Sequence, residues 1–536
     1  MSAPWDYIIV GAGSSGCVLA ERLSADPRCR VLLLEAGEVD DAFLVSMPKG
    51  IGKLASNPRH AWIYPVEQRR VADVPSTESW VRGKGLGGSS AINGMIWVRG
   101  RPEDYEAWER LGATGWGADT MRDAFMAIED HELGAGDGRG VGGPVHVSSG
   151  KFRYPLAEAL IEAGETMGLR RKEDLNSPGQ EGIGYYAHNI RHGRRQSAAT
   201  AFLKPARRRP NLQIETGVAV ERIRFDGRRA VAVEARGPEG PRVYTIGGEV
   251  ILSTGAVVSP AILQRSGVGP GALLSGLGID VVADRAGVGR HMQDHLGFSM
   301  PFRLRGVAGN NREFHGLGLA RNVLRYLLTH SGPLATGPYE IGAFLRSRPE
   351  VALPDMQLFG SAFTFRRVSN ANYPVQLAAV EKEPGLTLYA QLISLESEGE
   401  VYIRGAGSDD GLVIKPNWLS TANDEATAVA AVHTMRRLMA QPAISRFLSE
   451  ELAPGSTVET DAEILQAFRL LSRCGTHAVG SCRMGGEAEV CDPRLRVRGV
   501  EGVRVADCSV MPGLVSGNTN APAMALGWYA ASLIRS

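Results

Sequence analysis

The sequence predicts an α/β fold, α+β over the whole chain, in which a glycine-rich domain with a parallel sheet is joined to a second domain built on its own sheet. Two observations predict it. Strand, glycine turn, helix and strand follow one another between residues 6 and 37. From about residue 300 to 473 the glycine motifs stop, and alternating strand candidates and a long helix follow. At 536 residues the chain is long enough for two domains.

The N-terminal segment predicts a Rossmann-type nucleotide site. Gly11 permits a tight turn after an apolar strand, Gly13 lets the backbone approach a pyrophosphate, and Gly16 lets the helix pack on the strand. The free N–H groups of that helix N-terminus then face the phosphates. Glu35 ends the second strand, where its carboxylate can accept hydrogen bonds from a ribose 2′-OH. We therefore expect an NAD-like or FAD-like ligand and not NADP, whose 2′-phosphate would require an arginine.

Composition excludes several other classes of protein. Lysine and arginine number 59 against 58 acidic residues, so nucleic acid or an anionic membrane is not the expected main partner. The six cysteines fit no zinc spacing and are expected to be reduced thiols in a cytoplasmic protein. The first strand begins within about five residues, which leaves no room for a signal peptide. No apolar run reaches about 18 residues, so no transmembrane segment is expected, while peripheral contact with the inner membrane stays open.

Two later segments predict further contacts with the ligand. Five glycines between Arg82 and Trp97 predict a backbone that folds closely round a flat or phosphorylated molecule, and the apolar run after them predicts a helix. The residues before them, 39–81, predict an irregular excursion over the ligand. A buried strand at 249–253 returns the chain to the nucleotide site, and Ser259 and Pro260 predict the cap and the first position of the next helix.

These motifs together resemble the glucose-methanol-choline (GMC) family of FAD oxidoreductases, end to end. Residues 83–93 are similar to the first family signature, 255–269 to the second, and 477–485 with 505–520 to the catalytic end. The nearest resemblance is to the bacterial branch of choline and alcohol dehydrogenases. It implies an FAD-binding domain of residues 1–150, 190–300 and 474–536, and a substrate-binding domain of residues 151–189 and 301–473.

The resemblance also implies which residues do what. Those expected to contact FAD are Gly11, Gly13, Ser14, Ser15, Gly16, Glu35, Ala36, Gly85, Asn93, Gly94, Met95, Ile96, Val220 and Asp507. His477 corresponds to the catalytic histidine and Asn520 to its partner. Ile92 stands where some members carry a histidine that bonds covalently to the flavin, so FAD is expected to be held non-covalently.

The chemistry of these groups suits oxidation of an alcohol, expected to be primary, to the aldehyde. A neutral imidazole such as that of His477 can accept the hydroxyl proton, while the flavin N5 accepts the hydride. A dehydrogenase that passes electrons to a quinone or another carrier is favoured. An oxygen-using oxidase of the hydroxymethylfurfural or aryl-alcohol type and, less strongly, a hydroxynitrile lyase are the alternatives.

Other candidate residues are less decisive. His291 and His295, four residues apart with Asp294 between them, resemble a metal pair, but no third ligand follows and no metal is expected. Glu340 either lines the substrate cavity or makes a structural hydrogen bond, and the sequence favours neither.

Overall fold

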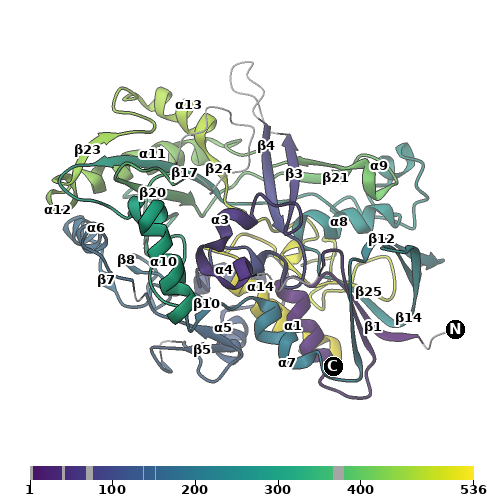
Figure 1. Cartoon of the computed structure of the whole chain (residues 1–536). Helices are drawn as coiled ribbons and strands as arrows, with labels where there is room; N and C mark the ends of the chain where they lie inside the picture. The colour runs from purple at the N-terminus through teal and green to yellow at the C-terminus, as the bar shows by residue number, and fades with distance from the viewer. Residues whose placement is uncertain (1–3, 39–42, 68–76, 137, 151, 366–379) are drawn as a thin grey trace.

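The computed structural model describes residues 4–38, 43–67, 77–136, 138–150, 152–365 and 380–536 (Figure 1). Within these ranges the strands form two large sheets, and each sheet has its own buried apolar core. The predicted α/β fold with a second sheet is confirmed. None of the helices in these ranges combines the length and apolar character needed to cross a bilayer.

The first sheet holds the predicted N-terminal strands at its centre. Its order is β11-β2-β1-β14-β13-β12, with β25 also paired to β14. Its strands are β1 (Trp5–Val10), β2 (Val31–Glu35), β11 (Leu212–Thr216), β12 (Ala219–Asp226), β13 (Arg229–Gly237), β14 (Gly240–Leu252) and β25 (Val503–Val505). The members around β1 are parallel, and β2 is buried along its whole length, as expected for a strand covered on both faces. Strands β12, β13 and β14 pair antiparallel in sequence order and form a meander.

The second sheet is mainly antiparallel, with the order β23-β17-β20-β19-β18-β8-β7 and β24 paired to β17 (upper left in Figure 1). Its strands are β7 (Arg171–Lys172), β8 (Gly182–Tyr185), β17 (Leu296–Leu304), β18 (Ile341–Leu345), β19 (Met356–Ser361), β20 (Gly385–Leu392), β23 (Leu448–Glu451) and β24 (Arg473–Cys474). One face presents aliphatic and Phe side chains such as Phe298 and Leu388, which join one core with helix residues such as Leu160, Met435 and Phe468. The opposite face carries glycine, glutamine and aromatic residues.

Helices and shorter strands surround these sheets. The helices are α1 (Ser14–Leu23), α2 (Phe43–Ser46), α3 (Ile51–Leu54), α4 (Pro102–Arg110), α5 (Ala118–Ile128), α6 (Pro155–Thr166), α7 (Lys204–Ala206), α8 (Gly255–Arg265), α9 (Gly271–Gly276), α10 (Gly316–Thr329), α11 (Ala422–Met439), α12 (Pro442–Ser445), α13 (Asp461–Leu471) and α14 (Asn520–Arg535). The short strands pair as β3 (Ala61–Glu67) with β4 (Thr77–Gly83), β5 (Glu129–His131) with β6 (Val145–Val147), β9 (Ile190–Arg191) with β10 (Arg194–Arg195), β15 (Val268–Gly269) with β16 (Ala283–Asp284), and β21 (Glu400–Ile403) with β22 (Leu412–Lys415).

Three local predictions were wrong. Residues 39–81 are not wholly irregular, because their described part contains the antiparallel pair β3–β4. The run after Ala91 is not helical: only a single 3₁₀ turn (Gly88–Ala91) forms, and Met95 adopts a left-handed backbone with φ 61°. A separate prediction, of a strand at 376–380, is not tested, because those residues lie almost wholly outside the described ranges.

The third of these errors concerns the start of α8. The helix begins at Gly255, with Thr254 as its N-cap, and Pro260 lies inside it. Proline has no N–H to donate to the carbonyl four residues earlier, which is that of Ala256. The Ser481 hydroxyl donates to that carbonyl instead, at 2.6 Å. A side chain distant in sequence therefore makes the internal proline tolerable.

The predicted domain division stays a proposal. The strands of the second sheet fall within residues 151–189 and 301–473, except that β17 begins at Leu296 and β24 ends at Cys474. Both exceptions lie beside His295 and His477, so the two predicted domains meet there.

Candidate active site

Three glycine-rich loops meet at the end of β1. Gly11 has a left-handed φ of 97°, and a Cβ placed on Gly16 would lie 2.0 Å from the Gly11 carbonyl oxygen. A Cβ on Gly37 would lie 2.2 Å from the nitrogen of Gly85. The Gly87 N–H donates to the Ala12 carbonyl at 2.8 Å. Side chains are sterically excluded here, so the predicted glycines are required for the loops to close on one another.

Glu35 ties these loops together. Its Oε2 accepts the Ala12 N–H at 2.9 Å, and its Oε1 accepts those of Gly37 at 2.8 Å and Gly85 at 3.0 Å. Burial raises the pKa of this carboxyl, and the three backbone donors oppose that shift. The sequence predicted a bond to a ribose. Each carboxylate oxygen has two acceptor sites, so Oε2 keeps one for that hydroxyl.

Two helix N-termini converge beside the first loop. The Ser14 hydroxyl, at the start of α1, donates to Oδ1 of Asn520, at the start of α14, at 2.8 Å. The next hydroxyl, that of Ser15, donates to the Ala523 carbonyl at 2.8 Å. Gly13 caps α1 without a side chain. Both helices therefore point their positive ends at one place, which suits an anion such as a pyrophosphate.

The side chain of Asn520 retains one unused group. Its Nδ2 is buried and has no hydrogen-bond partner among the described residues. Buried donors in native proteins are nearly always satisfied, so this nitrogen indicates a missing polar group. The arrangement therefore fits a dinucleotide cofactor at the predicted place.

The pairing of Asn520 with His477 is corrected by the structure. Asn518, two residues earlier, points its Nδ2 at His477 Nε2 at 3.1 Å. Asn518 is itself oriented by Gln357 of β19, whose Nε2 donates to Asn518 Oδ1 at 3.1 Å and to the Tyr186 hydroxyl oxygen at 2.9 Å. The sequence motif Asn518-Thr519-Asn520 contains the amide that faces His477, but spacing alone did not show which of its two asparagines this is.

The opposite nitrogen of His477 meets a second histidine. His295 Nδ1 lies 3.0 Å from His477 Nδ1, and His295 Nε2 lies 3.1 Å from the Val515 carbonyl oxygen. A carbonyl only accepts, so His295 Nε2 carries its proton and His295 Nδ1 is the acceptor. His477 must then donate from Nδ1. In the neutral ring this leaves Nε2 without a proton, facing Asn518.

Burial keeps both rings neutral. It lowers the pKa of His295 to about 4. It also lowers the pKa of His477 well below its usual value, assisted by the neighbouring His295 and by the Arg82 guanidinium. The backbone of His477 is held by Asp294, whose Oδ1 accepts its N–H at 2.7 Å. The result is an unprotonated imidazole nitrogen in a fixed orientation.

The segment expected to meet the flavin is held by a residue that the sequence analysis missed. Arg195 is buried, and its Nη1 donates to the Asn93 carbonyl at 2.6 Å and to Asn93 Oδ1 at 2.8 Å. Its Nη2 has no partner among the described residues. Asn93 Oδ1 also accepts the Met95 N–H at 3.0 Å, which stabilises the left-handed turn. Gly94 lies against Pro338, and Ile96 pairs with His188.

The remaining predicted cofactor residues lie near the same loops. Ala36 directly follows β2, and Val220 lies at the start of β12, where the Val218 N–H donates to the Glu35 carbonyl at 2.9 Å. Asp507 acts as a cap for α8: its Oδ2 accepts the Gly255 N–H at 2.8 Å and the Ser259 hydroxyl at 2.6 Å. Ser259 therefore contributes to the helix start from inside the helix, and not as the predicted cap.

The residues set aside by the sequence analysis have other partners. His291 Nδ1 pairs with Glu398 Oε2 at 2.6 Å, so the two histidines considered as a metal pair face different groups. Glu340 forms a buried ion pair with Lys49, 3.2 Å between Oε1 and Nζ. All six cysteines are free thiols.

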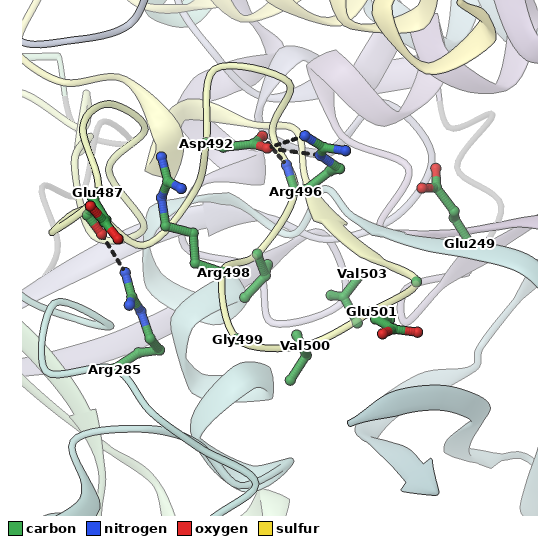
Figure 2. A pocket seen from close by; sticks show the side chains of 12 residues that line it. Glu249, Arg285, Glu487, Asp492, Arg496, Arg498, Gly499, Val500, Glu501 and Val503 are labelled. Carbon is green, nitrogen blue, oxygen red and sulfur yellow. Dashed lines mark hydrogen bonds and ion pairs between the residues drawn. The ribbon is translucent and has the colours of Figure 1, made fainter. Parts of the chain in front are cut away.

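A surface pocket of about 550 Å³ lies elsewhere, along the C-terminal segment 487–503 (Figure 2). Some of its charged side chains have partners: Asp492 pairs with Arg496, and Arg285 donates to the carbonyl of Glu487. None of the predicted site residues lines it.

Comparison with known proteins defines the class of this enzyme. Residues 5–297 and 396–527 match the two sequence profiles of the GMC oxidoreductase family. Human mitochondrial choline dehydrogenase is 38% identical over 99% of this chain and 90% of its own length. An alcohol dehydrogenase [acceptor] from Pseudomonas putida is 37% identical over 99% of this chain and 95% of its own length. The crystal structure of pyridoxine 4-oxidase from Mesorbium loti superposes with a TM-score of 0.88 at 32% identity over 98% of each chain.

The fold and the site therefore define an FAD-dependent oxidoreductase that acts on the CH–OH group of an alcohol. The chain belongs to the GMC oxidoreductase family.

Proposed function

We propose that this enzyme oxidises a primary alcohol to the aldehyde, with His477 as the base and Asn518 as the donor that steadies the alcohol oxygen. The observation that carries the proposal is the unprotonated Nε2 of His477 beside the Asn518 amide, 3.1 Å away. An alcohol hydroxyl that takes the place of this direct contact can donate to His477 Nε2 and accept from Asn518 Nδ2. Both groups are neutral before the reaction. As negative charge develops on the alcohol oxygen, the oriented Asn518 N–H can stabilise it.

The protein residues act mainly by holding protons in place. As His477 Nε2 accepts the hydroxyl proton, the ring becomes an imidazolium whose Nδ1–H still donates to His295. Gln357 holds the Asn518 amide so that its Nδ2 keeps facing the reacting oxygen. When bound, FAD supplies the acceptor for the hydride that leaves the carbinol carbon.

We propose that FAD is held non-covalently. Its pyrophosphate would lie at the N-termini of α1 and α14, near Asn520 Nδ2, and its flavin ring along residues 93–96. Ile92 supports the absence of a covalent link, because it is 7% exposed in an apolar cluster with Val45 and Leu54 and carries no nucleophile. Acid precipitation should release yellow FAD into the supernatant. Flavin that stays with the precipitate would contradict this part of the proposal.

The proposed electron acceptor is a quinone or another carrier and not mainly oxygen. The similarity to the alcohol dehydrogenase [acceptor] and to choline dehydrogenase supports it. The similarity to pyridoxine 4-oxidase supports the oxidase alternative. Enzyme reduced by an alcohol should be reoxidised faster by a soluble quinone analogue than by aerated buffer. Reoxidation in air at the turnover rate would establish the oxidase instead.

The decisive test of the reaction class is anaerobic. A panel of primary, aromatic and polyol alcohols should include some that bleach the flavin absorbance without oxygen. If none does, and cyanohydrins are cleaved instead, the enzyme is a lyase. The same panel identifies the substrate class.

A further inference from the structure

Helix α10 (Gly316–Thr329) presents an apolar face to the outside of the protein. Its buried side is made by Asn322 and Tyr326. In Figure 1 the helix lies along the front of the molecule with no ribbon over it. Six large apolar side chains of this helix are exposed: Leu317 (91%), Leu328 (74%), Leu324 (58%), Leu327 (52%), Leu319 (38%) and Val323 (37%). Phe43, 48% exposed and in edge-to-face contact with Tyr326, extends the face.

So many exposed apolar side chains on one helix are unusual for a protein surface. Single exposed apolar residues are normal, but a contiguous set marks a surface that is covered by something else. Leu317, Ala320, Leu324 and Leu328 follow one another at i, i+3, i+7 and i+11, which places them on one side of the helix. That side points away from the core. The usual orientation of an amphipathic helix is thus reversed here.

The charges around the face indicate what covers it. Between Arg305 and Ala335 there are four arginines, at 305, 312, 321 and 325, and one acidic residue, Glu313. Glu313 is paired with Arg321, 2.7 Å apart. Arg312 and Arg325 are exposed at the two ends of the helix. An apolar face bordered by arginines suits a bilayer surface with anionic headgroups. A symmetric dimer through the same face would instead bring the two sets of arginines together.

We propose that α10 docks the enzyme on an anionic membrane surface, with its leucines inserted among the acyl chains and its arginines at the headgroups. At 14 residues the helix is roughly 20 Å long, too short to span the hydrocarbon, so it lies in the interface plane. The balanced net charge of the whole chain does not conflict with this, because the excess of arginine is local.

The docking helix is connected to the candidate active site. His330, the residue that directly follows the helix, contacts Arg194 of β10, and the neighbour of Arg194, Arg195, holds Asn93. Eight residues beyond His330, Pro338 lies against Gly94. Docking would therefore place the flavin-side loop close to the bilayer. The inference that a membrane-dissolved quinone is the acceptor rests on the proposed function. The inference that α10 binds the membrane does not depend on it.

Vesicle co-sedimentation of the FAD-loaded enzyme tests the proposal. It should sediment with vesicles of phosphatidylcholine and phosphatidylglycerol, and less with phosphatidylcholine alone. The triple variant Leu317→Gln/Leu324→Gln/Leu328→Gln should lose at least tenfold in partitioning. The double variant Arg312→Gln/Arg325→Gln should lose about fivefold for each arginine and no longer respond to phosphatidylglycerol. Turnover with a soluble dye should not change in either.

Two controls make the result interpretable. Val243→Gln, at a strand residue 56% exposed and far along the first sheet, should sediment like the parent. Leu324→Trp should shift its emission to shorter wavelength when vesicles are added. The proposal is overturned if the parent stays in the supernatant with both vesicles, or if the control loses as much binding as the triple variant. It is equally overturned if light scattering shows a dimer that the triple variant dissociates while vesicle binding is absent.

Discussion

His295 and His477, 182 residues apart in sequence, share a hydrogen bond between their Nδ1 atoms at 3.0 Å. Because His295 donates its single N–H, on Nε2, to the Val515 carbonyl, its Nδ1 can only accept, and the bond between the two rings determines which nitrogen of His477 is free. A base with the other tautomer would present an N–H to the alcohol and could not accept its proton. The proposed role of His477 as the base therefore depends on a residue that need not touch the substrate.

Replacing His477 by alanine should slow flavin reduction by an alcohol by roughly 10²–10⁴-fold, the usual range for a lost general base. FAD should be retained, because its expected contacts lie elsewhere. Anaerobic stopped-flow measurement compares the variant with the parent. A variant reduced at the parental rate would end the assignment of His477 as the base.

Substitution of Asn518 and of Asn520 should affect different properties of the enzyme. Asn518→Ala should slow flavin reduction by roughly 10²-fold, as for the loss of one donor to a developing oxyanion, and should keep its FAD. Asn520→Ala removes the partner of Ser14 and should weaken FAD retention by about fivefold with a smaller effect on reduction. Both are measured on FAD-reconstituted protein. The opposite pattern would restore Asn520 as the partner of His477.

His295 is expected to act as a positioning residue. His295→Leu leaves the Nδ1–H of His477 without an acceptor, and an unsatisfied buried donor costs about 1–3 kcal/mol, so reduction should slow roughly tenfold or more. His295→Asn offers an oxygen as acceptor and should recover part of the rate. The loss should fall on kcat and leave KM nearly unchanged. A purely structural role predicts instead that both variants lose FAD or stability together.

The pH dependence follows from the direction of the His477 shift. The base must be unprotonated, and burial lowers its pKa below the ordinary value of about 6.5. Flavin reduction should therefore stay constant as pH falls to about 6.5 and decrease only below it. The acidic limb should be absent in His477→Ala. A limb above the ordinary histidine value would show that another group, or a charged His477, controls the reaction.

Ser481→Ala should lower stability without removing catalytic groups. The Ala256 carbonyl, already deprived of an N–H partner by Pro260, would be left buried and unpaired, at a cost of about 1–3 kcal/mol. Thermal unfolding of the FAD-loaded protein should show a lower midpoint. Ser532→Ala, at an exposed serine of α14, serves as the matched control and should not shift it. Equal midpoints for the two variants would refute this explanation of the internal proline.

The sequence by itself determined the nucleotide-binding half of this protein. The strand–turn–helix–strand unit from β1 to β2, with Gly11, Gly16 and Glu35, was predictable because each requirement is local: a tight turn, a close helix approach, an acid at a strand end. The resemblance to a known family added His477. The same sequence did not predict β3 and β4 or the left-handed turn at Met95, which depend on pairing and on Arg195 across the fold.

Only the tertiary structure decided which residues surround His477, the proposed base. Asn518 and Asn520 are two residues apart, but one precedes α14 and the other begins it, so the backbone turns their amides toward different partners. His295 directly precedes β17 and Gln357 lies on β19. Nothing in their sequence spacing indicates that both lie beside His477 and Asn518. Hydrogen bonds across long sequence separations are set by the packing of the two sheets, and that packing is not encoded in any local pattern of the chain.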